Sequence, residues 1–175
     1  GDGRVVAAAL MTPPWQAVMS CIDDPRAVDA IVADLGTFDP PAPGVLGPVE
    51  VARAFARAWC EPRDLLARRA VAERIYRLER VIAPVGVAGA VRIATGADRD
   101  LLIEWMREFM VEALGRPDGV EARGMVDRGL ELGSRTFYLW EADGRAVSVA
   151  GVGGRTPNGI RVGPVYTPPA WRGHG

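Results

Sequence analysis

The sequence predicts an α/β (α+β) protein in which helices flank a mixed, mostly antiparallel sheet. From residue 90 onward, hydrophobic periodicity indicates one strand, two helices and then three strands in quick succession. Asp143-Gly144 is typical of the tight turn that joins two antiparallel strands. The run Ala146 to Gly153 is small or apolar throughout, which is typical of a strand in the interior of a sheet.

The first half of the chain predicts two further strands and two helices. Val5 to Met11 is continuously apolar, which fits a strand buried on both faces, and a second strand is expected over 16–22. Asp24 and Pro25 are typical of a helix start, and apolar residues at helical spacing follow them. Another amphipathic helix is expected after Pro48.

The segment 64–82 fits two secondary structures. Its apolar residues recur at helical spacing, but they also fit a strand with arginines on a solvated face, and we expect a strand over 69–81. Residues 84–90 are small, uncharged and rich in residues that break helices and strands. They predict a linker between two domains, which cover residues 1–83 and 91–175.

The second domain is expected to begin with a short strand and a capped helix. A strand over 91–93 leads to Thr95 and Asp98, which are spaced as in a capping box. The helix that follows is expected to end at Gly115, and a second helix covers about 120–132. The two glycines within that second helix each weaken it by about 1 kcal/mol.

Composition argues against several classes of function. The 175 residues carry a net charge of -1, so neither nucleic acid nor an anionic membrane is an expected partner. All 21 basic residues are arginine, which leaves no lysine to act as a base. With one histidine, and with Cys21 and Cys60 outside any CxxC spacing, no metal site is expected. No apolar run reaches the roughly 18 residues of a membrane span, so we expect a cytoplasmic protein with reduced cysteines.

A strand followed by a glycine-rich turn lies at the end of the sequence. The strand is expected over 160–166, and the chain then runs through two prolines into residues 172–175, which read Arg-Gly-His-Gly. Such a turn presents successive backbone N–H groups to a phosphate, and glycines let the phosphate approach the backbone closely. An ordinary surface turn is the alternative explanation.

The order of elements from residue 90, together with this strand and turn, resembles the GNAT family of N-acetyltransferases. The coenzyme A loop of that family reads Arg/Gln-x-x-Gly-x-Gly/Ala, and residues 172–175 fill its first four places. The resemblance covers about half of the chain. It implies a GNAT-like sheet flanked by helices, and we expect this sheet to be truncated after the fourth strand of the C-terminal domain.

The first half resembles a second, degenerate copy of part of the same fold. Asp2-Gly3-Arg4 and Asp143-Gly144-Arg145 are each followed by an apolar strand. No Arg-Gly-x-Gly turn follows in the first half, so that half has no visible means to bind a pyrophosphate. Similar strands after similar turns also arise by chance, which leaves an accessory α/β half-domain as the alternative.

The resemblance implies acetyl-CoA as a co-substrate and no metal. The backbone of Val165, Tyr166 and Thr167 is then expected to pair with the pantetheine arm as an added strand. Gly163-Pro164 fits this arrangement, because a bulge there frees polar backbone groups for a ligand. The pyrophosphate is expected to bind the four residues of the turn, Arg172, Gly173, His174 and Gly175.

The resemblance also implies the reaction, in which a primary amine attacks acetyl-CoA directly in a ternary complex. A carboxylate is the usual base in the family, and Glu141 and Glu104 are the nearest candidates, although each also fits a solvated surface charge. His174 is not expected to be the base, because its place in the turn mainly supplies a backbone N–H. The acceptor is expected to be a small-molecule or peptide amine, and a homodimer is compatible with the family. The alternative is a non-catalytic module of the same fold that binds acyl-CoA or a protein partner.

Overall fold

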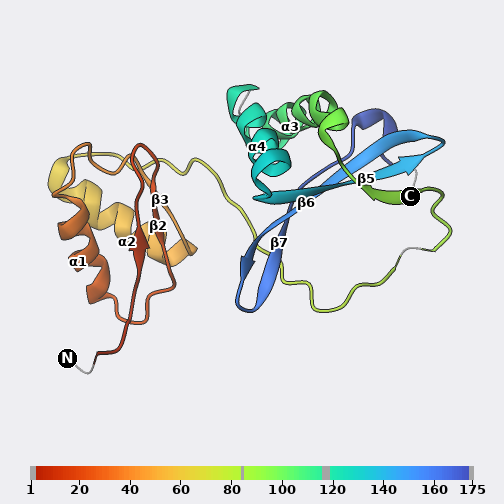
Figure 1. Cartoon of the computed structure of the whole chain (residues 1–175). Coiled ribbons are helices and arrows are strands. Elements are labelled where there is room, and N and C mark those ends of the chain that lie inside the picture. The colour runs from red at the N-terminus through yellow and green to blue at the C-terminus, as the bar shows by residue number, and fades with distance from the viewer. Residues whose placement is uncertain (1–2, 84, 116–118, 174–175) are drawn as a thin grey trace. The chain divides into compact units, whose positions relative to one another are not determined.

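The computed structural model describes residues 3–83, 85–115 and 119–173 of the chain. Internal contacts divide the chain into two compact units, Gly1–Glu73 and Arg74–Gly175, and Figure 1 shows both. Each unit has its own hydrophobic core.

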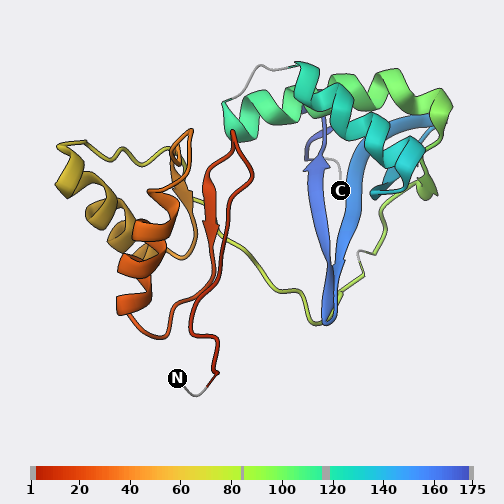
Figure 2. The ribbon, with the colours of Figure 1, turned by 60° about the vertical axis from the view of Figure 1, so that its left-hand side comes forward.

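The first unit packs two helices on a small sheet, as Figure 2 shows. Its three strands pair in chain order, β1 antiparallel and β3 parallel to β2. The elements of this unit are β1 (Ala9–Leu10), β2 (Ala17–Met19), α1 (Arg26–Leu35), β3 (Val45–Leu46) and α2 (Val49–Cys60).

One face of this small sheet is buried under the apolar stripes of α1 and α2. Ala17 and Met19 of β2 are buried, whereas Val18 between them is 45% exposed, because successive side chains of a strand point to opposite faces. In α2, the rings of Phe55 and Trp59 stack with their centroids 5.5 Å apart inside the same core. The two helices predicted from sequence are confirmed.

The prediction that Val5 to Met11 forms a strand buried on both faces is wrong. Only Ala9–Leu10 forms a strand, both of its residues are exposed, and Val5 is 81% exposed. β1 lies at the edge of the sheet, where it has one neighbouring strand, and the helices cover β2 rather than β1. An apolar run alone therefore did not indicate how much of it is buried.

The strand predicted over 69–81 is also wrong. Residues 65–83 form neither a helix nor a strand, and the Ile75 side chain is fully exposed. A strand is stabilised by pairing with neighbours, and no strand of either sheet pairs with this segment.

The second unit is an antiparallel sheet with two helices packed on one face (Figure 1). The strands pair in the order β4-β5-β6-β7, and every neighbouring pair is antiparallel. Its elements are β4 (Ala90–Ile93), α3 (Arg99–Leu114), α4 (Gly119–Leu132), β5 (Arg135–Ala142), β6 (Arg145–Thr156) and β7 (Gly159–Tyr166). The predicted fold class, helices flanking a mostly antiparallel sheet, is confirmed.

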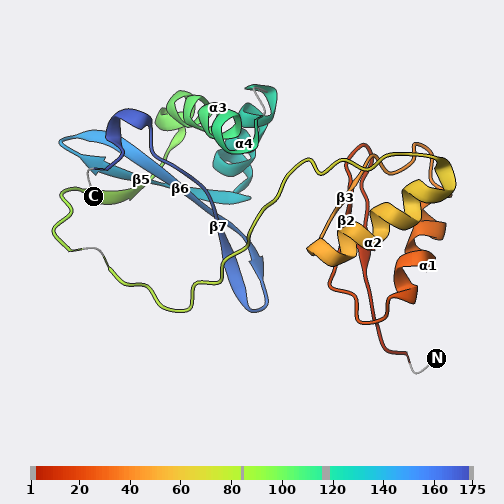
Figure 3. The ribbon, with the colours of Figure 1, turned by 180° about the vertical axis from the view of Figure 1, so that it is seen from behind.

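Local signals set the ends of the helices in this unit. Thr95 and Asp98 form the predicted capping box at the turn that leads into α3. Gly115 ends α3 with a φ of 62°, a left-handed conformation that glycine adopts without strain. The α3–α4 pair, seen from behind in Figure 3, covers Phe137 and Leu139 of β5, which are 1% and 0% exposed.

Gly129 of α4 allows the helix to approach the sheet closely. A Cβ atom at this position would lie 2.6 Å from Cε2 of Phe137. The other glycine of the helix, Gly124, does not pack on the sheet in this way. A Cβ there would lie 3.0 Å from the guanidinium of Arg128, which is an exposed side chain. The sequence marked both glycines as weak points of the helix, but Gly129 is required by packing.

We expect Gly124→Ala and Gly129→Ala to change stability in opposite directions. Alanine at 124 gains about 0.5–1 kcal/mol of helix propensity, and Arg128 can move aside. Alanine at 129 must displace the buried Phe137 ring, which costs about 1–3 kcal/mol. Urea unfolding of the full chain, followed by circular dichroism, measures both changes. Equal stabilisation by the two substitutions would contradict the close packing of α4 on β5.

Candidate functional site

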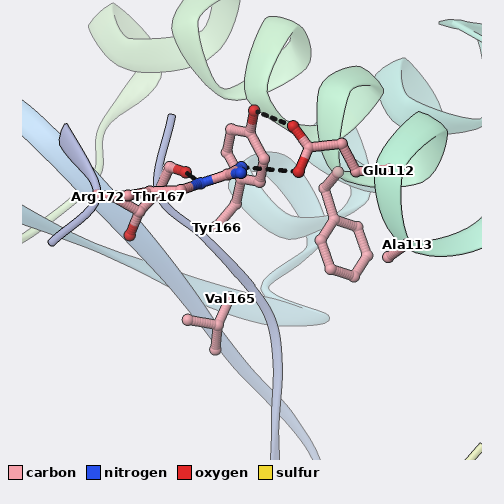
Figure 4. Close-up of a pocket in the computed structure, with 7 residues that line it drawn as sticks. Glu112, Ala113, Val165, Tyr166, Thr167 and Arg172 are labelled. Atoms are coloured by element: carbon pink, nitrogen blue, oxygen red, sulfur yellow. Dashed lines mark hydrogen bonds and ion pairs between the residues drawn. The ribbon is translucent and has the colours of Figure 1, made fainter. Parts of the chain in front are cut away.

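The end of β7 meets the C-terminal half of α3, and an open pocket of about 420 Å³ lies between them (Figure 4). Its apolar lining comes from both elements, and its polar groups come from α3, from β7 and from the residues that follow β7. The residues that line it are Phe109, Glu112, Ala113, Val165, Tyr166, Thr167 and Arg172.

Tyr166 joins β7 to α3 across the floor of this pocket. Its buried ring places the hydroxyl 2.9 Å from Oε2 of Glu108, to which it donates, and 3.3 Å from Oε1 of Glu112. Burial, together with the hydrogen bond to Glu108, raises the pKa of Tyr166 to about 12. The phenol therefore remains a hydrogen-bond donor throughout the physiological pH range.

Arg172 lies at the mouth of the pocket and contacts both of its sides (Figure 4). Its Nη2 is 2.7 Å from Oε2 of Glu112, and its Nε donates to the carbonyl oxygen of Thr167 at 2.8 Å. The guanidinium carbon lies 5.6 Å from the centroid of the Tyr166 ring. The hydrogen bond to Glu112 raises the pKa of Arg172 above its ordinary value, so its positive charge is fixed beside the pocket.

The outer edge of β7 is available to pair with an extended ligand. β7 ends the order of strands, and within the described part of the chain no strand pairs with its outer edge. Between the pairs Ala150–Val165 and Val152–Val162, β7 has one residue more than β6, which is a bulge. Gly163 lies in this bulge with a φ of 149°, where a side chain would be strained.

The structure brings together four of the residues that the sequence assigned to coenzyme binding, since Val165, Tyr166, Thr167 and Arg172 line one pocket. Gly173 follows with a φ of 78°, and nothing lies within 4 Å of the place of its missing Cβ. The predictions for His174 and Gly175 fall outside the described residues.

The two carboxylates that the sequence proposed as bases lie in different places. Glu104 lines a second hollow, of about 330 Å³, which shares Glu112 and Tyr166 with the first. Glu141 lines neither hollow, and its Oε1 accepts a hydrogen bond from Nε of Arg92 at 2.7 Å.

Sequence reasoning missed Glu108 and Glu112, which hold Tyr166 and Arg172. Glu104, Glu108 and Glu112 recur every four residues, a spacing that places side chains on one face of a helix. This acidic row was visible in the sequence. That it faces Tyr166 depends on how α3 crosses the sheet, which no local pattern specifies.

Arg92 of β4 binds two carboxylates and joins three elements. Its Nη1 and Nη2 lie 2.8 and 2.7 Å from the two oxygens of Asp98, which precedes α3, and its Nε bonds to Glu141 of β5. The Arg92 guanidinium lowers the pKa of Asp98 to about 2. Glu141 thus lies within a network that stabilises the fold.

Neither a metal-binding group nor a membrane-spanning helix is found among the described residues. No group of three or more His, Cys, Asp or Glu side chains there could hold a metal ion. No helix within 3–83, 85–115 and 119–173 is long and apolar enough to cross a membrane.

Comparison with known proteins finds a distantly similar solved structure. No protein-family model matches the sequence, and no curated protein matches it significantly. Among solved structures, one match is described as a predicted acetyltransferase with acetyl-CoA from Clostridium acetobutylicum. The two chains are 18% identical with a TM-score of 0.39, and the match covers 50% of this chain and 64% of that one.

We expect Asp98→Asn to destabilise the protein, and the loss to depend on pH. Because the pKa of Asp98 is lower in the folded state than its ordinary value of 3.8, ionised Asp98 stabilises the fold above pH 3.8. This stabilisation is lost as the pH falls toward 2. The shift corresponds to about 2 kcal/mol, which solvent around Arg92 reduces to about 1 kcal/mol. Urea unfolding at pH 7 and at pH 2.5 measures the difference between the variant and the natural sequence. Asp100→Asn, whose side chain is 98% exposed, is the control, and an equal effect of both substitutions would contradict the role of the network.

Proposed function

We propose that the second unit binds acetyl-CoA along the outer edge of β7 and transfers the acetyl group to a primary amine. This proposal rests on three features that lie together in one pocket. The unpaired edge of β7, the Arg172 guanidinium and the Glu108–Tyr166–Glu112 cluster all meet at the pocket between β7 and α3.

The residues present fit the chemical parts of the coenzyme. The amides of the pantetheine arm can pair with outward-facing backbone groups at the end of β7 as an added strand, and Nε of Arg172 would then give up the carbonyl oxygen of Thr167. Arg172 can bind the pyrophosphate through charge-assisted hydrogen bonds. Gly173 leaves space for a phosphate to approach the backbone.

Binding of the pyrophosphate would change the partner of Arg172. The guanidinium contacts Glu112 at 2.7 Å, and a phosphate competes with that carboxylate for the same donors. Once Arg172 turns to the phosphate, Glu112 loses its counter-ion and becomes available as a proton acceptor beside the pocket. We therefore assign the base to Glu112 rather than to Glu104 or Glu141.

The proposed reaction is a direct transfer in which these residues have separate roles. The amine nitrogen attacks the carbonyl carbon of the thioester, a C–N bond forms, and the C–S bond breaks. Glu112 would take the proton that the amine loses, and coenzyme A would leave as a thiol once that proton has passed from Glu112 to its sulfur through solvent. Because the pKa of Tyr166 is raised to about 12, its hydroxyl stays protonated and keeps its hydrogen bond to Glu108, which holds the end of β7 in place.

We expect Arg172→Glu to weaken the binding of acetyl-CoA and of free coenzyme A by at least about tenfold, because a charge-assisted contact becomes a repulsion. Isothermal titration calorimetry on the full-length protein measures both affinities. Arg145→Glu makes the same change of charge at an exposed position at the start of β6 and should leave them unchanged. No binding by the natural sequence, or equal binding by Arg172→Glu, would reject the coenzyme site.

We expect Glu112→Gln to lower kcat by about 10²–10⁴ without weakening coenzyme binding, because glutamine cannot take the proton and no longer neutralises Arg172. A thiol-release assay over a panel of amines measures kcat, and calorimetry measures binding. Glu131→Gln, on the exposed side of α4, is the matched control. Binding of acetyl-CoA without thiol release for any amine would favour a non-catalytic acyl-CoA-binding module instead.

A further inference from the structure

Two arginines of the second unit lie on either side of β6. In the strand register, Arg135 of β5 lies opposite Gly153 of β6, and Gly153 lies opposite Arg161 of β7. Directly opposed residues of an antiparallel sheet share one face. Two positions along β5, Phe137 is buried under the helices, so by the alternation of side chains Arg135 and Arg161 lie on the face that α3 and α4 cover.

The floor between these arginines has no side chains. Gly151 and Gly153 occupy this face of β6, opposite Phe137 and Arg135. A Cβ at Gly151 would lie 2.6 Å from Cδ of Arg135, so the arginine stem runs directly over that glycine. The same point is 3.1 Å from the carbonyl oxygen of Gly163, which places the Arg135 stem beside the bulge of β7.

These positive charges have no counter-ion within the described part of the chain. Nε of Arg135 is buried without a hydrogen-bond partner. Burial lowers the pKa of Arg135, and the two charges that lower it further are also positive, those of Arg161 and of Arg128 in α4. A half-buried guanidinium with unused donors and cationic neighbours is an unfavourable arrangement unless an anion binds there.

We propose that Arg135 and Arg161, with Arg128 nearby, bind the carboxylate or phosphate group of the acceptor amine. This inference rests on the proposed acetyl transfer, and it names the class of substrate. The bulge of β7 lies between Arg161 and the Val165–Thr167 edge. An acceptor held by its anion at the arginines would therefore extend toward the coenzyme edge.

Guanidinium groups suit this role because they present several N–H donors in a planar fork that matches an oxyanion. The two glycines of β6 let the Arg135 stem lie close against the sheet, because a Cβ at Gly151 would be 2.6 Å from its Cδ. The acceptors that fit are small molecules that carry an amine and an anion, such as amino acids or amino phosphates. Uncharged amines and aminoglycosides lack the group that the arginines would bind.

Inorganic phosphate tests the anion site without acetyl-CoA. Calorimetry on the full-length protein is expected to show phosphate binding that Arg161→Gln and Arg135→Gln each weaken by at least about tenfold. Arg145→Gln, at the opposite end of β6, should bind phosphate normally. Arg161 is exposed, so its substitution tests the site even where Arg135→Gln impairs folding. Equal phosphate affinity in the natural sequence and in Arg161→Gln would overturn the site.

Matched acceptors then test whether the anion belongs to the substrate. β-Alanine is compared with its amide, and phosphoethanolamine with ethanolamine, in the thiol-release assay. In at least one pair, the KM of the anionic amine is expected to be about tenfold or more below that of its neutral partner. Arg161→Gln should abolish this difference in KM, and Arg145→Gln should keep it. The pair with the larger difference shows whether the site prefers a carboxylate or a phosphate. Equal KM values for anionic and neutral amines would overturn the inference while the acetyl transfer stands, whereas failure to bind acetyl-CoA would reject the proposed function even where phosphate still binds.

Discussion

The hydrogen bond from the Tyr166 hydroxyl to Glu108 is the contact on which the candidate site depends. It links the end of β7 to α3 at 2.9 Å, and the Tyr166 ring belongs to the core of this unit. Because Tyr166 is fixed by burial, the residues on either side of it, Val165 and Thr167, are held where the outer edge of the sheet is open. The same bond joins Tyr166 to the acidic row on α3, in which Glu112 pairs with Arg172.

Charge is distributed unevenly along β7. At its C-terminal end the strand meets carboxylates from α3, and near its start Arg161 lies across a glycine from Arg135. The bulge at Gly163 lies between these ends. Under the proposals above, this arrangement suits an acceptor with two functional groups. Its anion would bind at Arg135 and Arg161, and its amine would lose a proton beside the coenzyme. The Arg172–Glu112 pair would also fix the order of binding and catalysis, because the coenzyme must displace Glu112 from Arg172 before Glu112 can act as the base.

Much of the second unit follows from its sequence, whereas the site only partly does. The capping box at Thr95, the Asp143-Gly144 turn and the apolar strand after it are local signals, and the structure has all three. The segment 69–81 could not be predicted, because a strand needs a partner that its own residues do not specify. Glu112 and Arg135 were missed for the same physical reason, since each acquires its role from an element far away in the chain.

A crystal structure of the protein with acetyl-CoA tests the central claim most directly. The account predicts that the pantetheine arm lies along the backbone of Val165 to Thr167, and that the Arg172 guanidinium has left Glu112 for the pyrophosphate. A coenzyme bound away from β7, or an Arg172–Glu112 ion pair that persists at 2.7 Å beside the bound coenzyme, would contradict it.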